Sequence, residues 1–132
     1  MKTIYTVAVS MVVGGLFGGA AIQTLQAQVK SPVYLVSEID VNNPEAYGKE
    51  FAPVAQATIK SAGGKFVAIG GTAGVGAKPV TALAGTPPKR VTIQLWNSME
   101  AVNTWYNSKP YQDALKIGEK YATFRRYIIE AQ

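Results

Sequence analysis

The sequence predicts one small α+β domain whose strands and helices follow each other in the order β-α-β-β-α-β. Three observations support this prediction. Apolar and polar residues alternate along Val33–Val41 and Lys89–Trp96, which is the period of a half-buried strand. A helix-start signal, an Asn or Ser followed two residues later by Glu, comes directly after each of these segments. The length of 132 residues leaves room for little more than one domain.

The N-terminal segment looks like a secretory signal peptide and not like part of this domain. Lys2 supplies a positive charge, and no charged residue follows until after Ile22. A short basic start, an apolar stretch and then small residues are typical of such signals, and Ala27 fits the last residue before cleavage. The alternative is an uncleaved anchor, because the apolar stretch nearly reaches the about 20 residues that span a bilayer.

We therefore expect an exported protein, periplasmic or secreted, that contacts a membrane only if this signal is retained. The expected organisation is a signal peptide over 1–27, a short tail over 28–32 and the α+β domain over 33–132.

The first predicted strand, Val33–Val41, has two different faces. Its alternating residues divide into the sets Tyr34, Val36, Glu38, Asp40 and Val33, Leu35, Ser37, Ile39, Val41. A helix is predicted to follow it from Asn43-Pro44-Glu45, because Asn caps helices, Pro suits the first turn and an acid favours the N-terminal end.

Within this helix an apolar stripe at helical spacing is expected to face the core. It consists of Tyr47, Phe51, Val54, Thr58 and Ala62. Pro53 lies inside the helix and cannot donate a hydrogen bond to the carbonyl of Lys49, so a kink is predicted there. Gly63-Gly64 ends the helix.

The central part of the chain predicts two more strands joined by a long loop. Lys65–Ile69 is the second strand. Gly70–Pro88 is rich in Gly and Pro and is predicted to be mainly loop, with a short edge strand over Pro79–Ala84. In the third strand, Lys89–Trp96, the aliphatic side is expected to meet the helices. The opposite side, with Thr92, Gln94 and Trp96, is then expected to be open.

The last third of the chain predicts two helical stretches and a final strand. Asn97-Ser98 caps a helix to about Ser108, Lys109-Pro110 starts another to about Ala122, and Phe124–Glu130 is the last strand. This order is the split βαβ, or ferredoxin-like, arrangement, with helices on one face of an antiparallel sheet. Because the other face needs a cover, we expect a homodimer in which two sheets face each other.

Several sequence blocks between Val33 and Gln132 resemble one known family. They are Glu38-Ile39-Asp40-Val41, Asn43-Pro44-Glu45-Ala46-Tyr47, Gly63-Gly64-Lys65-Phe66, Gly70-Gly71, Ser98-Met99-Glu100-Ala101, Trp105-Tyr106-Asn107-Ser108 and Pro110-Tyr111-Gln112. In these blocks the chain is similar to the small bacterial proteins grouped as domain of unknown function 1330. The resemblance implies a dimeric α/β-barrel, ferredoxin-like fold and no settled activity. Gln94 departs from the acidic residue more common in that family, and the loop over 72–88 looks longer.

The residue types that are missing exclude several kinds of chemistry. The chain contains no His and no Cys, which excludes a Ser-His-Asp triad, a Cys nucleophile, and zinc or haem held by His or Cys. Its eight acidic residues show no metal-ligand spacing, so we predict neither a metal nor a cofactor. The net charge of +5 is scattered along the chain and predicts no nucleic-acid partner.

The best candidate for a general base is Glu38, which shares a strand face with Asp40, about 7 Å away along the strand. In the alternative interpretation Glu38 pairs with a Lys or Arg across the sheet, and Asp40 helps to cap the following helix. The ligand site is predicted between the two sheets of the dimer, lined by Tyr34, Glu38, Gln94 and Trp96.

Other residues have two interpretations each. Trp105 and Tyr111 are ligand-binding candidates that form an aromatic wall, or else core side chains. Arg125-Arg126 places one guanidinium on each sheet face, where one could bind an anionic ligand or form a surface ion pair. The Gly-rich stretch Gly70–Lys78 lacks the Gly-Lys-Ser/Thr order of a phosphate loop and is interpreted as a flexible connection.

Three functions stay open at this point. The first is a dimeric module that binds a small apolar or aromatic molecule between its sheets. The second is a cofactor-independent enzyme like the dimeric α/β-barrel monooxygenases and isomerases, in which Glu38 or Gln94 handles a proton; it rests on fold analogy. The third is a structural or stress-related protein without pocket chemistry.

Overall fold

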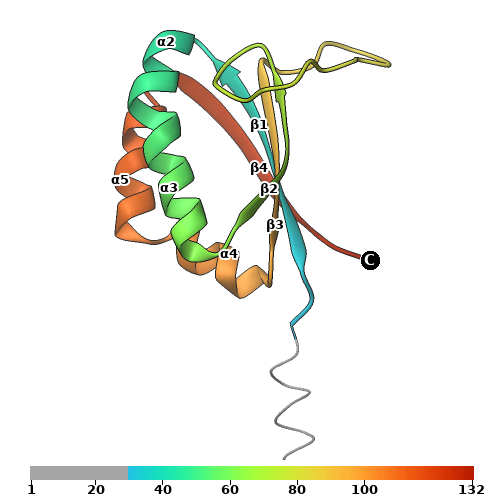
Figure 1. Ribbon diagram of the computed structural model, residues 1–132, viewed down its shortest axis with the longest axis vertical. Helices are drawn as coiled ribbons and strands as arrows, with labels where there is room; N and C mark the ends of the chain where they lie inside the picture. Colours follow the sequence, from blue (N-terminus) through green and yellow to red (C-terminus); the bar gives the residue numbers. More distant parts are fainter. Residues whose placement is uncertain (1–29) are drawn as a thin grey trace, which may run out of the picture. The chain divides into compact units, whose positions relative to one another are not determined.

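A computed structural model describes residues 30–132 as an antiparallel sheet with helices packed on one of its faces (Figure 1). The signal peptide predicted over 1–27 lies outside the described residues. Among the helices that the model describes, none is long and apolar enough to cross a membrane.

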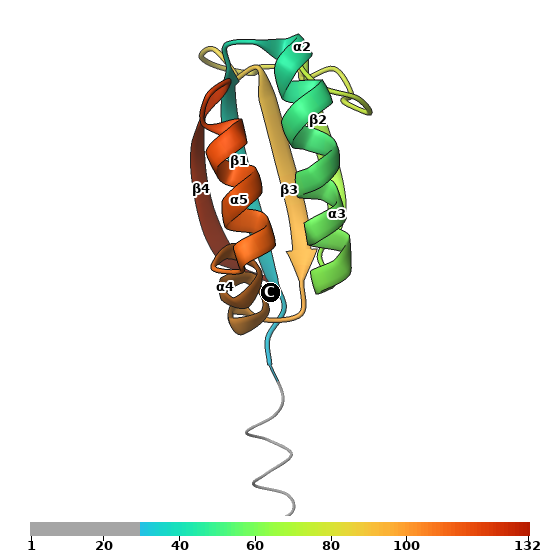
Figure 2. The same ribbon diagram turned by 90° about the vertical axis from the view of Figure 1, so that its left-hand side faces the viewer.

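The observed elements confirm the predicted β-α-β-β-α-β order. They are β1 (Val33–Val41), α2 (Pro44–Ala46), the π-helical turn η1 (Tyr47–Phe51), α3 (Ala52–Ala62), β2 (Lys65–Gly71), β3 (Arg90–Trp96), α4 (Met99–Tyr106), α5 (Lys109–Gly118) and β4 (Ala122–Glu130). The strands lie in the order β2-β3-β1-β4, and each neighbouring pair is antiparallel. Helices α3 and α5 lie across the same face of this sheet (Figure 2). We call it the helix face, and the opposite one the open face.

Capping side chains determine where the helices begin. Asn43 precedes α2, and its Oδ1 accepts a hydrogen bond from the amide of Ala46 at 3.1 Å. Ser98 precedes α4 and accepts from the amide of Ala101 at 3.1 Å through its Oγ. Ser108 caps α5 in the same way. Each cap satisfies an amide that has no partner inside its own helix, so these short segments start at the predicted places.

The predicted core stripe of the first helical region is correct up to Phe51 and wrong beyond it. The buried positions after Phe51 are Ala52, Ala55 and Ile59, whereas Val54 is 46% exposed. The cause is the π-helical turn η1, in which the amide of Ala52 bonds to the carbonyl of Tyr47, five residues back. A π turn inserts one extra residue into the helix, so every later core position moves on by one.

This turn lies directly before Pro53, where the sequence predicts a kink. Pro53 cannot donate to the carbonyl of Lys49, and the wider turn absorbs that missing hydrogen bond. The irregularity therefore occurs at the predicted position, but it takes the form of a π turn.

The predicted orientation of β3 is wrong. Arg90, Thr92, Gln94 and Trp96 are buried on the helix face, with exposed fractions of 1–4%, while the aliphatic residues between them lie on the open face. The register with β1 fixes this choice, because Val33 pairs with Trp96 and directly paired residues point to the same face.

Aromatic packing explains why this side of β3 is the buried one. The ring centroids of Trp96 and Trp105 are 5.2 Å apart, and those of Trp105 and Tyr111 are 4.0 Å apart. The indole nitrogen of Trp96 donates to Oε1 of Gln94 at 3.0 Å, so both polar groups are buried with a partner. A tryptophan side chain offers a large apolar area for burial, and the hydrogen bond between Trp96 and Gln94 offsets the penalty for burying their polar atoms.

The region after β2 differs from the predicted edge strand. No strand forms over 79–84. Just before this segment, Lys78 forms an isolated bridge with Gly70 of β2, with hydrogen bonds from the Lys78 amide to the carbonyl of Ile69 and from the Gly71 amide to the carbonyl of Lys78, both at 2.9 Å. Strand β2 itself contains a bulge between Phe66 and Ala68. The segment over 72–89 is a long loop beside the end of β2 (Figure 1).

Gly64 provides a test of this packing. A Cβ at this position would lie 2.5 Å from Cζ2 of Trp96 and 2.8 Å from Cγ2 of Ile59. We predict that Gly64→Ala lowers the free energy of unfolding by about 1–3 kcal/mol, the usual cost of overpacking. Gly48→Ala is the control, because a Cβ there meets nothing within 4 Å; it should be neutral or stabilising by up to about 1 kcal/mol. Urea unfolding measures both, and equal effects would contradict this packing.

Candidate functional site

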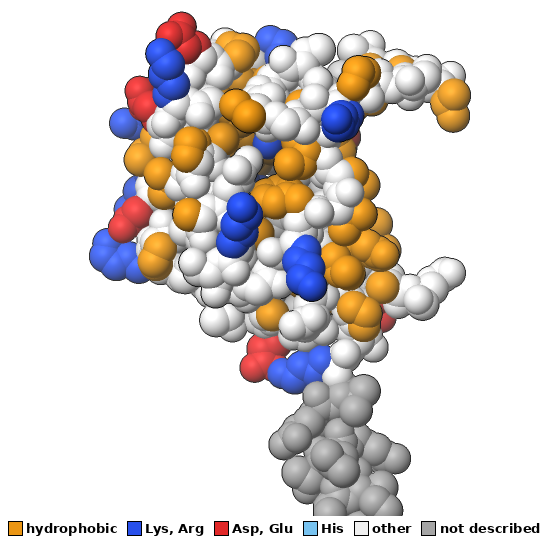
Figure 3. All heavy atoms as spheres, in the orientation of Figure 1, with side chains coloured by type: hydrophobic (Ala, Val, Ile, Leu, Met, Phe, Trp, Pro, Cys, Tyr) orange, Lys and Arg blue, Asp and Glu red, His pale blue; other side chains and the backbone are white. Residues whose placement is uncertain are grey.

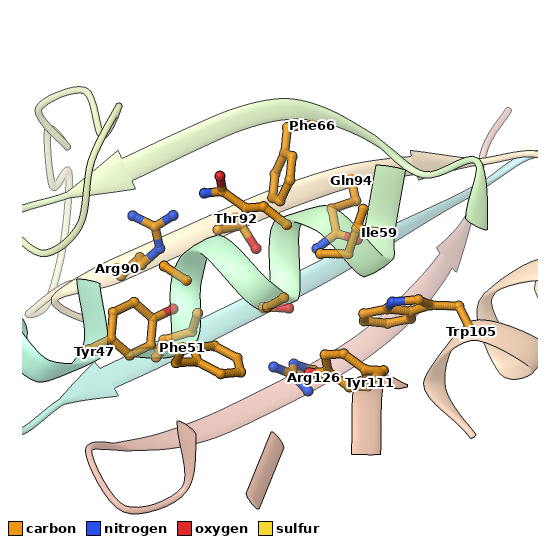
Figure 4. A pocket seen from close by; sticks show the side chains of 15 residues that line it. Tyr47, Phe51, Ile59, Phe66, Arg90, Thr92, Gln94, Trp105, Tyr111 and Arg126 are labelled. Atoms are coloured by element: carbon orange, nitrogen blue, oxygen red, sulfur yellow. The ribbon is translucent and has the colours of Figure 1, made fainter. Parts of the chain in front are cut away.

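A pocket lies between the helices and the helix face of the sheet (Figure 4). The enclosed cavity has a volume of about 30 Å³. With the space of its solvent-open mouth included, the volume is about 370 Å³. Its lining comes from the helical segments and from every strand of the sheet. The lining residues are Ser37, Ile39, Tyr47, Phe51, Ala52, Ala55, Gln56, Ile59, Phe66, Arg90, Thr92, Gln94, Trp105, Tyr111 and Arg126.

The sheet side of the pocket is unusually polar for a protein interior. Ser37 on β1 and Arg90, Thr92 and Gln94 on β3 are all buried, with exposed fractions of 2–4%. Such positions normally carry aliphatic side chains, because a buried polar group costs free energy unless it has a partner. Ser37 and Thr92 are directly paired across the strands, so the polar residues form one continuous floor.

Arg90 is held from one side by the long loop. Its Nη1 donates to the carbonyl of Ala73 at 2.9 Å, and Ala73 is itself buried at 2% exposure. Gly74 has φ +90°, and a Cβ there would overlap the guanidinium of Arg90. The loop backbone is therefore shaped around this arginine. On the other side, the Arg90 guanidinium lies 5.8 Å from the centre of the Tyr47 ring.

The opposite wall of the pocket is aromatic. Trp105 and Tyr111 are 3% and 1% exposed, and both line the pocket. The two interpretations of these residues are therefore compatible: they are core side chains that also face the cavity. Arg126 lies beside Tyr111 of this wall (Figure 4), with its guanidinium 5.3 Å from the ring centre of Tyr111. The same guanidinium lies 4.4 Å from the ring centre of Phe124.

The two tyrosines of the pocket stay neutral at ordinary pH. Burial raises the pKa of Tyr47, against the opposing charges of Arg90 and Arg126. Burial likewise raises the pKa of Tyr111 to about 12, and Arg126 opposes it. The pocket can thus offer neutral hydroxyls and guanidinium groups. None of its lining residues is a His, Asp or Glu that could serve as a base near neutral pH.

The open face carries a separate charged group at one end. Arg125 Nη1 bonds to Oδ2 of Asp40 at 2.8 Å, and its Nη2 lies 3.9 Å from Oε1 of Glu38. Tyr127 donates to Oε2 of Glu38 at 3.2 Å. Pairing of Glu38 with an arginine across the sheet is therefore confirmed. The expectation that Asp40 caps the next helix is wrong, because Asn43 does so.

The sheet separates the predicted ligand-binding residues into two groups. Tyr34 and Glu38 lie on the open face, whereas Gln94 and Trp96 lie on the helix face. A single site lined by all four between two sheets is therefore wrong in geometry. Gln94, together with Trp105 and Tyr111, lines the pocket under the helices; Trp96 packs behind Trp105.

Sequence reasoning missed Arg90 and Tyr47 as pocket residues. The available signal was that Arg90 shares the alternating face of Thr92, Gln94 and Trp96. For Arg126, alternation on the last strand correctly placed the two neighbouring guanidinium groups on opposite faces. In residues 30–132 no group of three or more potential metal ligands occurs.

The fold and the pocket define a ferredoxin-like α+β protein with a polar, aromatic-walled pocket between its helices and its sheet. A family model described as "Domain of unknown function (DUF1330)" matches residues 32–132, so the chain belongs to this family. This confirms the resemblance found in the sequence. No curated protein matches the chain.

Solved structures show the same fold at low identity. RPA0582 of Rhodopseudomonas palustris, in its methylated form, is 17% identical over 86% of this chain and 90% of its own, with a TM-score of 0.61. SnoaB, a cofactor-independent oxygenase from Streptomyces nogalater, is 16% identical over 77% and 94%, with a TM-score of 0.55. A dimeric protein of unknown function with a ferredoxin-like fold from Bacteroides fragilis is 9% identical over 76% and 96%, with a TM-score of 0.52.

The buried Tyr111 hydroxyl has no hydrogen-bond partner of ordinary geometry. We predict that Tyr111→Phe leaves the free energy of unfolding at pH 7 unchanged or slightly raised, because no partner is stranded. Thr58→Val is the control, since Thr58 Oγ1 accepts from the Trp105 indole at 3.1 Å; it should cost about 1 kcal/mol. Urea unfolding measures both. An equal loss in Tyr111→Phe would show that its hydroxyl is bonded.

The same variant tests the raised pKa. Because burial raises the pKa of Tyr111 from 10.0 to about 12, its hydroxyl is protonated in both the folded and the unfolded protein below pH 10, and its ionisation does not affect stability there. Between pH 10 and about 12 only the unfolded state ionises at this residue, so the free energy of unfolding falls by up to roughly 2.7 kcal/mol. Tyr111→Phe should therefore lose less stability than the wild type over this range.

Proposed function

We propose that the protein binds a small single-ring aromatic or similarly apolar molecule in the pocket between its helices and its sheet. The observation that carries this proposal is a buried polar floor facing an aromatic wall. Ligand pockets combine these features, since apolar walls supply affinity and a few polar groups fix orientation. The proposal keeps the class of ligand predicted from the sequence and moves its site from the open face to the helix face.

The size of the pocket limits the ligand. The free pocket admits about 30 Å³ of water-sized space, enough for roughly two water molecules. A ring therefore enters only if lining side chains move aside. Phe66 and Gln56 are partly exposed and can move at a smaller cost than Trp105 and Tyr111, which are fully buried. Polycyclic ligands are disfavoured for the same reason.

A second candidate function is cofactor-independent oxygenation of the bound molecule. It is supported by the shared fold of SnoaB, described as a cofactor-independent oxygenase, and by two arginines that could stabilise an anionic form of a substrate. Binding is better supported than turnover, because the pocket has no group that is basic near pH 7. Glu38, the candidate base predicted from the sequence, is on the other face of the sheet and is paired with Arg125.

Narrowing the pocket tests the binding proposal. Ala55 lines it at 6% exposure, so Ala55→Val fills part of the cavity. We expect wild-type tryptophan fluorescence to change saturably with phenol or benzyl alcohol. In Ala55→Val the affinity should fall at least about tenfold. Ala57→Val is the matched control on the exposed side of the same helix. Absence of saturable binding in the wild type, or equal binding by Ala55→Val, would contradict the proposal.

We further propose that the open face is covered by a second copy of the chain. This face is largely apolar, and hydrophobic side chains gather on the side of the sheet away from the helices (Figure 3). They include Tyr34, Val36, Val91, Ile93, Leu95, Tyr127 and Ile129. Its acidic residues Glu38 and Asp40 both pair with Arg125. Such a face needs a partner, and a two-fold dimer supplies one.

Ile129→Glu tests this interface. Ile129 is 53% exposed in the single chain, so the change should not harm the fold. It should convert a dimer into a monomer at micromolar concentration in sedimentation velocity, because a buried unpaired charge is costly. Val54→Glu is the control, with 46% exposure on a helix, and should leave the dimer intact. A wild-type monomer would contradict the proposal.

Export of the protein stays a proposal that rests on the sequence of residues 1–27. Intact-mass measurement of the protein from a periplasmic or culture fraction tests it.

A further inference from the structure

We propose that the ligand carries an acidic group, and that Arg90 and Arg126 bind this group inside the pocket. This inference rests on the proposed function and names the chemical class of the ligand: an aromatic carboxylate or an acid of similar shape and charge.

The first support is the unbalanced charge of the pocket. Two guanidinium groups line it and no carboxylate does. The acids of β1 lie on the other face of the sheet, where Arg125 pairs with them. Both pocket arginines act electrostatically on the hydroxyl of Tyr47, so their charges converge on one region. Arg90 is buried and Arg126 is half-buried. A buried cation such as Arg90 is costly unless an anion accompanies it, and a bound anion would supply the missing charge.

The second support is a pair of buried donors without partners. Arg90 is 2% exposed and Tyr111 is 1% exposed, and both line the pocket. Neither Nε of Arg90 nor the hydroxyl of Tyr111 has a hydrogen-bond partner of ordinary geometry; the nearest polar groups are Arg126, which faces the Tyr111 hydroxyl, and the Tyr47 hydroxyl, which faces Arg90. Buried polar groups in proteins are rarely left in this state, and each one needs an explanation. A carboxylate accepts several hydrogen bonds at once and can satisfy guanidinium and hydroxyl donors together.

The third support is the position of Arg126 at a second opening. Arg126 lines the inner pocket, and it also lines an outer groove between α5 and β4 that encloses about 890 Å³ with its open mouth included. Its guanidinium stacks on Phe124, which lines that groove too. Glu119 is the carboxylate of the groove and does not reach the inner pocket. A cation between solvent and cavity attracts anions and can bind them after entry.

A purely structural role explains only part of these observations. The bond from Arg90 Nη1 to the carbonyl of Ala73 anchors the long loop. That role does not account for the unpartnered Nε of Arg90, and it does not involve Arg126. The pair of arginines is therefore better explained by an anion than by the loop alone.

Benzoate and benzamide test the inference, because they have nearly the same shape and differ in charge. Binding is measured by tryptophan fluorescence and by the shift in thermal midpoint at pH 7. We expect the wild type to bind benzoate at least about tenfold more tightly than benzamide. Arg126→Gln should weaken benzoate about 10- to 100-fold, which corresponds to losing one charged hydrogen-bonding group. It should leave benzamide nearly unchanged.

Arg125→Gln is the matched control, since it removes the same charge one residue away on the opposite face. It should leave the affinity for both compounds unchanged. Arg90→Lys is a second variant that keeps the charge but removes the Nε donor; it should weaken benzoate selectively. A lowered thermal midpoint in Arg90→Lys would show that the bond from residue 90 to the carbonyl of Ala73 is lost. In that case the affinities of Arg126→Gln alone test the inference.

The outcomes separate this inference from the proposed function. Equal affinity for benzoate and benzamide, or an equal loss in Arg125→Gln and Arg126→Gln, would overturn the anionic ligand while a binding pocket remained. Binding of neither compound would overturn both.

Discussion

The structure depends on which side of β3 lies beneath the helices. The buried side carries Trp96, and this indole is packed between Gly64 and Trp105. Once Trp96 is buried, strand alternation forces Gln94, Thr92 and Arg90 into the same layer. The aromatic cluster thus brings a polar row into the interior. That row becomes the floor of a pocket, because amides, hydroxyls and a guanidinium do not fill space as branched aliphatic side chains do.

The same constraint determines the character of the open face. Val91, Ile93 and Leu95 point away from the helices, and Ile93 and Leu95 lie opposite Val36 and Tyr34 of β1. The sheet therefore has two faces with different tasks. The helix face holds a pocket with two arginines, and the open face is an apolar surface on which Arg125 pairs with two acidic residues. Glu38 belongs to the second face, which removes it from the chemistry of the pocket.

Local signals in the sequence were enough to predict the order of the elements and their caps. Asn43 and Ser98 act within one turn of their own helix, so their effect is readable without the rest of the chain. Two features were not predictable in this way. The π turn before Pro53 changes the helical phase by one residue. The side of β3 that is buried depends on the register of β3 with β1 and on the contact of Trp96 with Trp105. Such contacts join distant segments and leave no local signal. Hydropathy alone predicts that the aliphatic side of β3 is the buried one.

The site was predicted in part for the same reason. Polar and aromatic residues stand out in a small domain, which singles out Gln94, Trp105 and Tyr111; all three line the pocket, although Gln94 is predicted from the sequence on the open face. Arg90 was missed, since an arginine at a strand end normally lies in solvent. Its burial follows from the loop that wraps it through Ala73 and Gly74, and a Gly-rich loop gives no local sign of its target.

The most direct measurement is a crystal structure of the protein grown with 4-bromobenzoate, in which the anomalous signal of bromine locates the ring. We predict a bromine peak beneath the helices beside Trp105, with the carboxylate directed toward Arg90 and Arg126. A peak between the open faces of two chains, or no peak within the protein, would contradict a ligand site on the helix face.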